Sequence, residues 1–298
     1  MKKALRDALG NQYFINCGKS TTNALVTRCL CDENGKLTHE GRVVAIAVSS
    51  LKQQARALSL PINEVELTYR KRPEIAVRDY LLKQRAYNEV CFAEGGDIRI
   101  LLSCMCFEVV RKAWRVHCQT HPLYKSYHES YGESAVESSI ISYMYSSPLG
   151  SVGLLDLLEN KPDLYKYLIE AIIEAISTAK KDDIEKAFCT LKQWHEDMGW
   201  TGDNWPWKNY VGLRLLFIVS LYEALGNIVL ADIAKTYFID PGALGKGWPD
   251  ITAIDKNNNV KLFEIKTSDK FNPSQIITIS AMANYFHTEV IKVKRSVN

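Results

Sequence analysis

Three residues, Asp250, Glu264 and Lys266, have the types and spacing that hydrolysis of a phosphodiester bond requires. Glu264 and Lys266 lie two positions apart, and alternate side chains of a strand project to the same face, so the two are expected side by side. If Asp250 begins the neighbouring strand of a hairpin, its carboxylate is expected next to Glu264. Two carboxylates and an ammonium group would then meet at one end of a sheet.

This set of groups suits metal-assisted hydrolysis. The carboxylates of Asp250 and Glu264, with the backbone carbonyl of Ile265, are oxygen ligands of the kind that Mg²⁺ or Mn²⁺ prefers. Such a metal lowers the pKa of a bound water, and Lys266 would orient that water or stabilise the developing negative charge. The same spacing also arises by chance, in which case Glu264 and Lys266 form a solvated strand face and Asp250 is a turn residue.

The elements around these residues are those of an α/β core over residues 211–298. Two helices, two strands, a third helix and a last strand are expected in turn, over 211–225, 228–238, 251–254, 260–265, 273–286 and 289–293. The turn-rich segment Asp255–Asn259 separates the first two strands, as in a hairpin.

The preceding residues predict two further regions. Apolar residues at three- and four-residue spacing predict a helical region over 73–210. Residues 1–72 predict an accessory region, with a hairpin over 24–31 that turns at 32–35 and a helix from Thr38 to Leu58. The pattern N-G-K-L-T-H-E-G-R-V-V-A resembles the passage from wing to helix in winged-helix DNA binders, and an accessory helical cap is the alternative.

The segments G-W-P-D-I, L-F-E-I-K-T-S-D-K and P-S-Q together resemble the virus-type replication-repair nuclease (VRR-NUC) family of the PD-(D/E)xK superfamily. The resemblance implies an α+β protein, in which a mainly helical N-terminal region is followed by a PD-(D/E)xK restriction-endonuclease-like α/β core. It implies that Asp250 and Glu264 are metal ligands, that Lys266 is the catalytic lysine, and that Gln275 is a helix glutamine near the active centre.

A wider resemblance links the chain to the Fanconi-associated nuclease branch of that family. It is carried by Trp194-His195-Glu196, Trp207 and the segment 226–230, and it implies selectivity for branched or flapped DNA. The family also places a further acidic ligand on a helix before the core. Glu170 is the candidate here, Glu137, Glu174 and Glu223 are rivals, and a solvent-exposed helix glutamate is the alternative for each.

Contacts with DNA phosphates are expected from basic residues that flank the core. The candidates are Lys246, Lys270, Lys292, Lys294 and Arg295, with a solvated surface as the alternative. Trp200, Trp205 and Trp207 can stack on bases or pack in a core. The pairs Cys29/Cys31 and Cys104/Cys106 lack a matching histidine pair, which favours reduced thiols over a zinc site.

These observations predict a Mg²⁺- or Mn²⁺-dependent deoxyribonuclease, used in replication and repair or as a DNA-degrading toxin or defence effector. A toxin would have a cognate inhibitor protein as partner. The alternative is a non-catalytic nucleic-acid-binding or scaffold protein with the same fold, and a homodimer is left open.

The bulk properties are compatible with this prediction and exclude other classes. The formal net charge of +3 does not by itself indicate a nucleic-acid binder. No phosphate-binding loop motif occurs, which excludes an ATP-driven motor within these residues. The polar start Met1–Asp7 and the charged, short apolar stretch Val211–Leu225 predict a cytoplasmic protein with no membrane contact.

Overall fold

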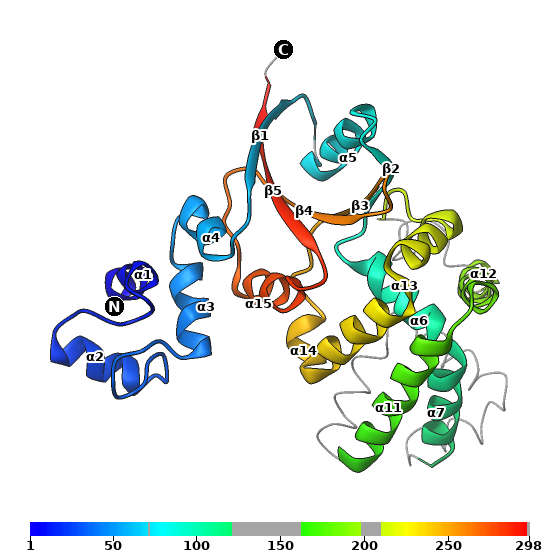
Figure 1. Ribbon diagram of the computed structural model, residues 1–298, viewed down its shortest axis with the longest axis horizontal. Coiled ribbons are helices and arrows are strands. Elements are labelled where there is room, and N and C mark those ends of the chain that lie inside the picture. The colour runs from blue at the N-terminus through cyan, green and yellow to red at the C-terminus, as the bar shows by residue number, and fades with distance from the viewer. Residues whose placement is uncertain (71, 121–161, 198–209, 297–298) are drawn as a thin grey trace. The chain divides into compact units, whose positions relative to one another are not determined.

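A computed structural model describes residues 1–70, 72–120, 162–197 and 210–296 (Figure 1). The protein is a mixed α/β structure that divides into two compact units. The first unit contains residues 1–77, 246–249 and 262–298, and the second contains residues 78–245 and 250–261.

The first unit contains the N-terminal helices, the C-terminal helix and two of the strands. Its elements are α1 (Lys2–Gly10), α2 (Lys19–Val26), α3 (His39–Ala47), α4 (Leu51–Ala57), β1 (Ile62–Leu67), most of β4 (Val260–Lys266), α15 (Pro273–Met282) and β5 (His287–Arg295), while α5 (Pro73–Lys83) crosses the boundary. The second unit contains β2 (Tyr87–Phe92), α6 (Gly96–Met105), α7 (Phe107–Thr120), α11 (Pro162–Thr178), α12 (Lys181–Asp197), α13 (Leu215–Ile239), α14 (Pro241–Leu244) and β3 (Ile251–Asp255).

The strands form a mixed sheet in the order β1-β5-β4-β3-β2. β1 runs parallel to β5, with a register from Ile62 opposite Val290 to Leu67 opposite Arg295. β2 runs antiparallel to β3, with an irregularity between Tyr87 and Glu89. The central strand β4 is buried at every position except Lys261, so both faces of this strand are covered and its polar side chains lie within the protein.

Two apolar clusters join α3 to its neighbours in the first unit. Val43 and Ile46 of α3 pack with Ala55 of α4 and with residues of α15 and β5. Ala45 of the same helix packs with the second cluster, which contains Leu5 of α1. α3 therefore lies between α1 and α15, as Figure 1 shows.

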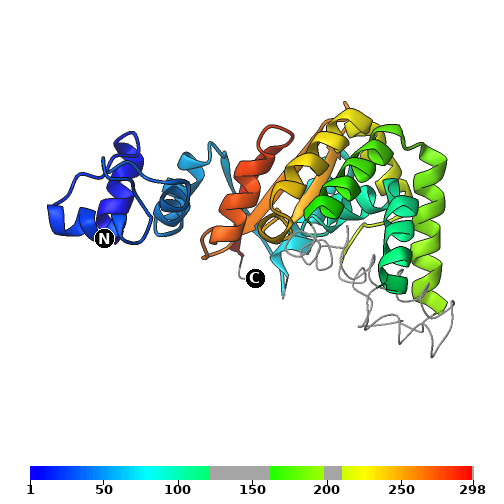
Figure 2. The ribbon, with the colours of Figure 1, turned by 90° about the horizontal axis from the view of Figure 1, so that it is seen from below.

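The second unit is built around α13, which packs against α6, α11 and α12. Figure 2 shows α13 and α11 running side by side. Gly226 interrupts the helical backbone with a φ of 71°. The side-chain amide of the next residue, Asn227, donates to the carbonyls of Ile176 and Ala179 at 2.8 and 2.9 Å. The two helices predicted for this segment are thus two arms of one broken helix.

By length and composition, α13 is the one helix among the described residues that could cross a membrane. The core helix of a globular unit passes the same test, and α13 has ten buried residues, among them Phe217, Ile218 and Tyr237. Packing within the unit accounts for part of its apolar composition, since Ile228 and Ile239 are exposed.

The elements predicted downstream of Gly247 are confirmed, with small shifts of their ends. The strands β3 and β4, the intervening turn, α15 and β5 all occur. Asp255 organises the turn because its carboxylate accepts from the backbone of Asn257 at 2.8 Å and of Asn259 at 2.9 Å.

Predictions for the N-terminal half were wrong in three places. Residues 24–31 are not a strand, because α2 occupies Lys19–Val26 and only isolated bridges flank the turn at Asp32–Gly35. The long helix expected from Thr38 is two helices, because Ser50 forms a capping box with Gln53 and starts α4 afresh. Strands β1 and β2 lie where accessory and helical residues were expected, because polar and charged residues interrupt the apolar pattern of each.

Gly41 offers a test of the packing of α3. A Cβ added there would overlap the backbone carbonyl of Leu30, so Gly41→Ala is expected to destabilise the protein by about 3 kcal/mol. Gly10, at the end of α1, has no atom within 4 Å of an added Cβ, and Gly10→Ala should stabilise by about 0.5 kcal/mol. Urea unfolding of both variants measures the difference, and equal midpoints would contradict this packing.

Candidate active site

Glu264, Lys266 and Gln275 form one hydrogen-bonded cluster in the first unit. The ammonium of Lys266 lies 2.9 Å from Oε1 of Glu264, and the side chains are only 4% and 1% exposed. The Gln275 amide nitrogen donates to the same Oε1 at 2.5 Å, while its amide oxygen accepts from Lys266 at 3.1 Å. The side chains that the sequence predicted to be neighbours are in direct contact, and they are not a solvated strand face.

Gln275 reaches this position because of how α15 begins. Asn272 caps the helix by accepting from the Gln275 backbone at 2.9 Å, and the Gln275 side chain returns to the Asn272 backbone at 3.2 Å. This capping box fixes the amide of Gln275 in the third position of the helix. Its remaining hydrogen-bonding capacity is directed at Glu264 and Lys266.

Gly247 allows the segment before Asp250 to lie against the same helix start. A Cβ at Gly247 would overlap the backbone of Ser274 and Gln275, and its φ is +73°. The hydroxyl of Thr278 also donates to the carbonyl of Lys246 at 2.5 Å. The glycine of the G-W-P-D motif is therefore required by close backbone approach as well as by its conformation.

Burial raises the pKa of Glu264 from its ordinary 4.5 to about 7, although Lys266 and Gln275 both oppose the shift. Burial also lowers the pKa of Lys266, but the attraction of Glu264 and Asp269 outweighs this effect and the pKa is raised. The folded state binds a proton on Glu264 more tightly than the unfolded state does. This group's stabilisation is therefore complete below about pH 4.5 and is lost as pH rises through about 7.

Asp269, which the sequence analysis did not single out, is the second acidic partner of Lys266. Its carboxylate lies 3.0 Å from the ammonium and also accepts from the backbone of Thr267 at 3.2 Å. Asp269 is exposed, whereas Glu264 is buried. The spacing of three residues after Lys266, in a polar loop, is the sequence signal that indicates this contact.

Asp250 belongs to the second unit, where its backbone joins a second acidic residue. The amides of Ala93 and Glu94 both donate to the Asp250 carbonyl at 3.1 Å, directly beyond the pairing of Phe92 with Ile251. The backbone of Glu94 thus lies next to that of Asp250, just past the end of the β2–β3 pairing. The convergence of the Asp250 and Glu264 carboxylates remains a prediction.

The backbone around Glu94 is held in an unusual conformation. Glu94 and Gly95 both have a positive φ, 49° and 69°. A positive φ is uncommon for a residue with a side chain, such as Glu94, and such residues cluster at functional sites. The guanidinium of Arg99 fixes this turn by donating to the carbonyl of Gly95 at 3.3 Å and of Glu94 at 3.4 Å. The sequence signal was Glu-Gly-Gly between a strand and a helix, and it was missed because β2 was not predicted.

The donor atoms of the cluster fit a hard divalent cation. Oε2 of Glu264 is buried and has no hydrogen-bond partner, which leaves a carboxylate oxygen available to a ligand. Among the residues that the structure describes, no three His, Cys, Asp or Glu side chains group closely enough to hold a metal by themselves. A bound ion would therefore depend on backbone carbonyls such as that of Ile265, and on waters, which Mg²⁺ retains readily.

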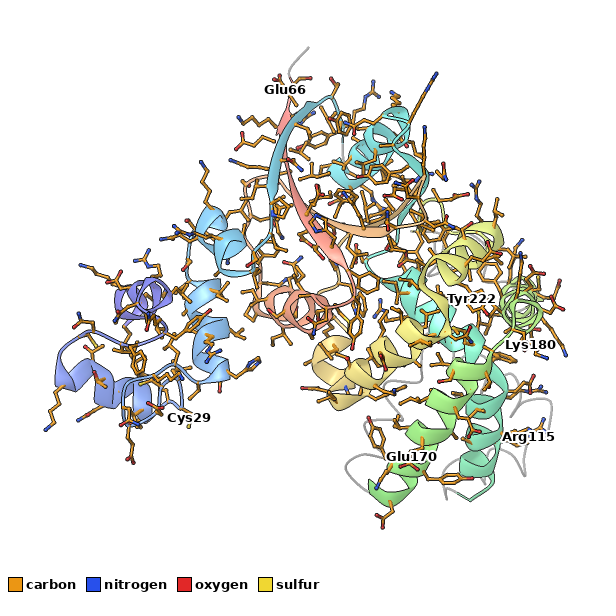
Figure 3. All side chains as sticks on the ribbon, viewed as in Figure 1. Cys29, Glu66, Arg115, Glu170, Lys180 and Tyr222 are labelled. Carbon is orange, nitrogen blue, oxygen red and sulfur yellow. The ribbon has the colours of Figure 1, made fainter. Side chains whose placement is uncertain are left out.

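The other described acidic candidates are on helices of the second unit. Glu170 is exposed on α11 (Figure 3), and Glu174 is exposed on the same helix. Glu223 pairs with Lys181 at 2.9 Å. Glu137 lies outside the described residues, as do Trp200, Trp205 and Trp207.

The paired cysteines show the environment of structural thiols. Cys104 and Cys106 are buried in α6 and at its end, and burial raises the pKa of Cys106 to about 12. Cys31 is buried whereas Cys29 is exposed. A raised thiol pKa disfavours the thiolate that zinc requires.

Two of the predicted DNA-binding lysines share one cavity in the first unit. This cavity, of about 400 Å³, lies beside the loop after Lys266 and is lined by Leu51, Lys52, Ile62, Glu64, Thr267, Ser268, Asp269, Lys270 and Lys292. Lys52 was not predicted. Lys292 lies 3.3 Å and Lys294 2.7 Å from Glu64, so these two charges are partly offset, while Lys246 and Lys270 are exposed.

Lys266→Met tests the electrostatics of the cluster. Because Lys266 lowers the pKa of Glu264, its removal is expected to raise that pKa above about 7. Carbon NMR titration of the metal-free protein measures the value, with Lys270→Met, an exposed lysine of the same loop, as the control that should leave it unchanged. An unchanged or lower pKa in Lys266→Met would show that the pair does not interact as described.

No family model matches the sequence, and no curated protein does. Solved structures do match. A crystal structure of paFAN1 bound to 2-nucleotide 5′-flap DNA with a gap aligns with 100% of this chain at a TM-score of 0.51 and 14% identity. A second, with 1-nucleotide 5′-flap DNA, aligns with 99% at a TM-score of 0.53 and 15% identity. This chain spans 49% of the length of each paFAN1 chain. Over the aligned part, this chain has a FAN1-like fold.

Proposed function

We propose that this chain is a Mg²⁺- or Mn²⁺-dependent deoxyribonuclease of the VRR-NUC type. The observation that carries the proposal is the buried Glu264–Lys266–Gln275 cluster with its unpartnered carboxylate oxygen. Burying two charges is costly unless they pair with each other or bind a ligand. Oε2 of Glu264 has no hydrogen-bond partner, which supports the binding of a ligand. The FAN1-like fold and the G-W-P-D motif support the same conclusion.

The proposal gives each residue a role. Asp250, Glu264 and the carbonyl of Ile265 would hold the cation, which activates a water and offsets charge on the scissile phosphate. Lys266 stabilises the negative charge that develops during in-line attack, and Gln275 keeps Lys266 and Glu264 oriented. Glu94, whose backbone is bonded to that of Asp250, would supply the further carboxylate for the cation, in the role assigned to Glu170 from sequence.

The substrate we propose is DNA with a 5′ flap. The paFAN1 structures contain 5′-flap DNA, and the fold of this chain matches the half of paFAN1 with which it aligns. Lys270, Lys292 and Lys52, which line one cavity next to the cluster, would contact backbone phosphates, and Lys246 would add a further contact. Contacts of this kind position DNA without reading its sequence.

Two biological settings fit this chemistry. A cytoplasmic repair nuclease would act on replication intermediates, alone or as a homodimer, whereas a toxin or defence effector would be kept inactive by a cognate inhibitor protein. A non-catalytic DNA-binding or scaffold protein is the rival function. The buried ion pair argues against it, since a scaffold gains nothing from desolvated charges.

Cleavage assays with flapped, nicked and single-stranded DNA test the activity. With Mg²⁺ or Mn²⁺, the wild type should cut flapped DNA, while Asp250→Ala, Glu264→Ala and Lys266→Ala should each lower kcat by about 10³-fold. Chelation should abolish cutting. Equal rates for wild type and Lys266→Ala would show that a contaminant or a different site is responsible.

A second comparison separates Glu94 from Glu170. Glu94→Gln should lower kcat by about tenfold or more and raise the Mn²⁺ concentration needed for half-maximal rate, because a carboxylate near the cation is lost. Glu170→Gln removes the same charge from an exposed helix position and should leave both quantities unchanged. The reverse result would return the ligand to α11.

A further inference from the structure

Gln54, on the N-terminal helix α4, is a fully buried side chain whose amide meets the active-site loop. Its Oε1 accepts from the backbone N–H of Phe271 at 2.9 Å, and its Nε2 donates to the Phe271 carbonyl at 3.0 Å. The same nitrogen donates to the carbonyl of Ala47 at 3.4 Å. The oxygen and the nitrogen of the Gln54 amide therefore both bond to the backbone of Phe271, which is 217 positions away.

Phe271 connects Gln54 to the catalytic lysine. Its buried ring lies 5.2 Å from the ammonium of Lys266, a distance at which the face of the ring attracts a cation. The loop on either side provides two further constraints, since Asp269 pairs with Lys266 and Asn272 caps the helix that presents Gln275. Among the described residues, the contacts of the Lys266 ammonium with Asp269, Gln275 and Phe271 thus depend on the course of the loop 267–272.

We propose that Gln54 is a positioning residue for catalysis: by clamping both backbone groups of Phe271, it holds the loop that keeps the Lys266 ammonium against Glu264 and Gln275. The inference rests on the proposed nuclease function and extends it to the N-terminal helices. These helices would support the active centre, and would not be only an accessory DNA-binding module.

Gln54 satisfies two buried backbone groups of Phe271. A buried N–H or carbonyl without a partner is costly, so a loop that loses Gln54 is expected to move until water reaches Phe271. The ring would then withdraw from Lys266, and misplacement of a catalytic group by a fraction of its contact distance lowers the chemical rate. Gln54 is fully buried, so its loss should spare KM.

Gln54→Met tests the proposal because it keeps the volume and removes both hydrogen bonds to Phe271, together with the one to Ala47. We expect kcat on flapped DNA to fall by about tenfold or more, with KM within about twofold of wild type. Ile46→Val, in the apolar cluster that contains Ala55 and Phe271, is the matched control. It loosens the same core without touching the clamp, so its kcat should stay at the wild-type value.

Two further measurements separate positioning from general weakening. The Phe271 amide should exchange with deuterium slowly in wild type and rapidly in Gln54→Met, whether or not the protein cuts DNA. Gln54→Met and Phe271→Leu should not be additive in kcat, because both act through one path to Lys266. If Gln54→Met does not fold, Gln54→Glu keeps the acceptor for the Phe271 N–H but removes the donor to the Phe271 carbonyl, and it should show the same fall in kcat with KM preserved.

The outcomes are distinct. An active Gln54→Met protein with wild-type kcat, or with only a raised KM, overturns the inference and leaves the proposed function standing. A wild type that protects Phe271 but cuts no DNA contradicts the proposed function, and with it the catalytic part of the inference. Additive effects of Gln54→Met and Phe271→Leu would show that the two residues act independently.

Discussion

The ion pair between Glu264 and Lys266 is the constraint on which the rest of the site depends. Both charges lie in a strand that is covered on both faces, where neither is solvated by water. Loss of either partner from such a pair lowers the free energy of unfolding by about 3–5 kcal/mol, because the other charge is left buried without a partner. The pair also leaves one buried carboxylate oxygen of Glu264 without a hydrogen-bond partner, and the proposed metal site is built on that oxygen.

The surrounding contacts keep this pair in one geometry. Gln275 belongs to a helix cap and cannot rotate freely, and Asp269 and Phe271 approach Lys266 from the loop between strand and helix. The ammonium therefore has an acid, an amide and an aromatic face as neighbours. Such preorganisation is what electrostatic stabilisation of a transition state requires, because no groups have to reorient when charge develops.

Much of the site was predictable because its residues are close in sequence and lie on strongly patterned elements. Glu264, Lys266 and Gln275 fall within one strand, loop and helix, whose periodicity and capping residues predict their arrangement. Gln54 and Glu94 were not predictable in the same way. Their contacts are made with residues 217 and 156 positions away, and neither local spacing nor composition contains that information.

The fold shows the same division. The strands and helix downstream of Gly247 follow from alternation, a turn and a cap, while β1 and β2 were missed because polar and charged residues interrupt the apolar pattern of each. β1 has an exposed or half-exposed pattern, as expected of a strand at the border of a sheet. Its place is determined by pairing with β5, which tertiary packing decides and local preference does not.

The parallel pairing of β1 with β5 has a consequence for biosynthesis. Ile62 pairs with Val290, so a segment made early must wait for one made late before the first unit can close. Parallel contacts between distant residues form slowly, and the nascent chain exposes their apolar surfaces meanwhile. A nascent chain that has not reached Val290 would lack this border of the sheet, and β1 would stay unpaired until that segment has been made.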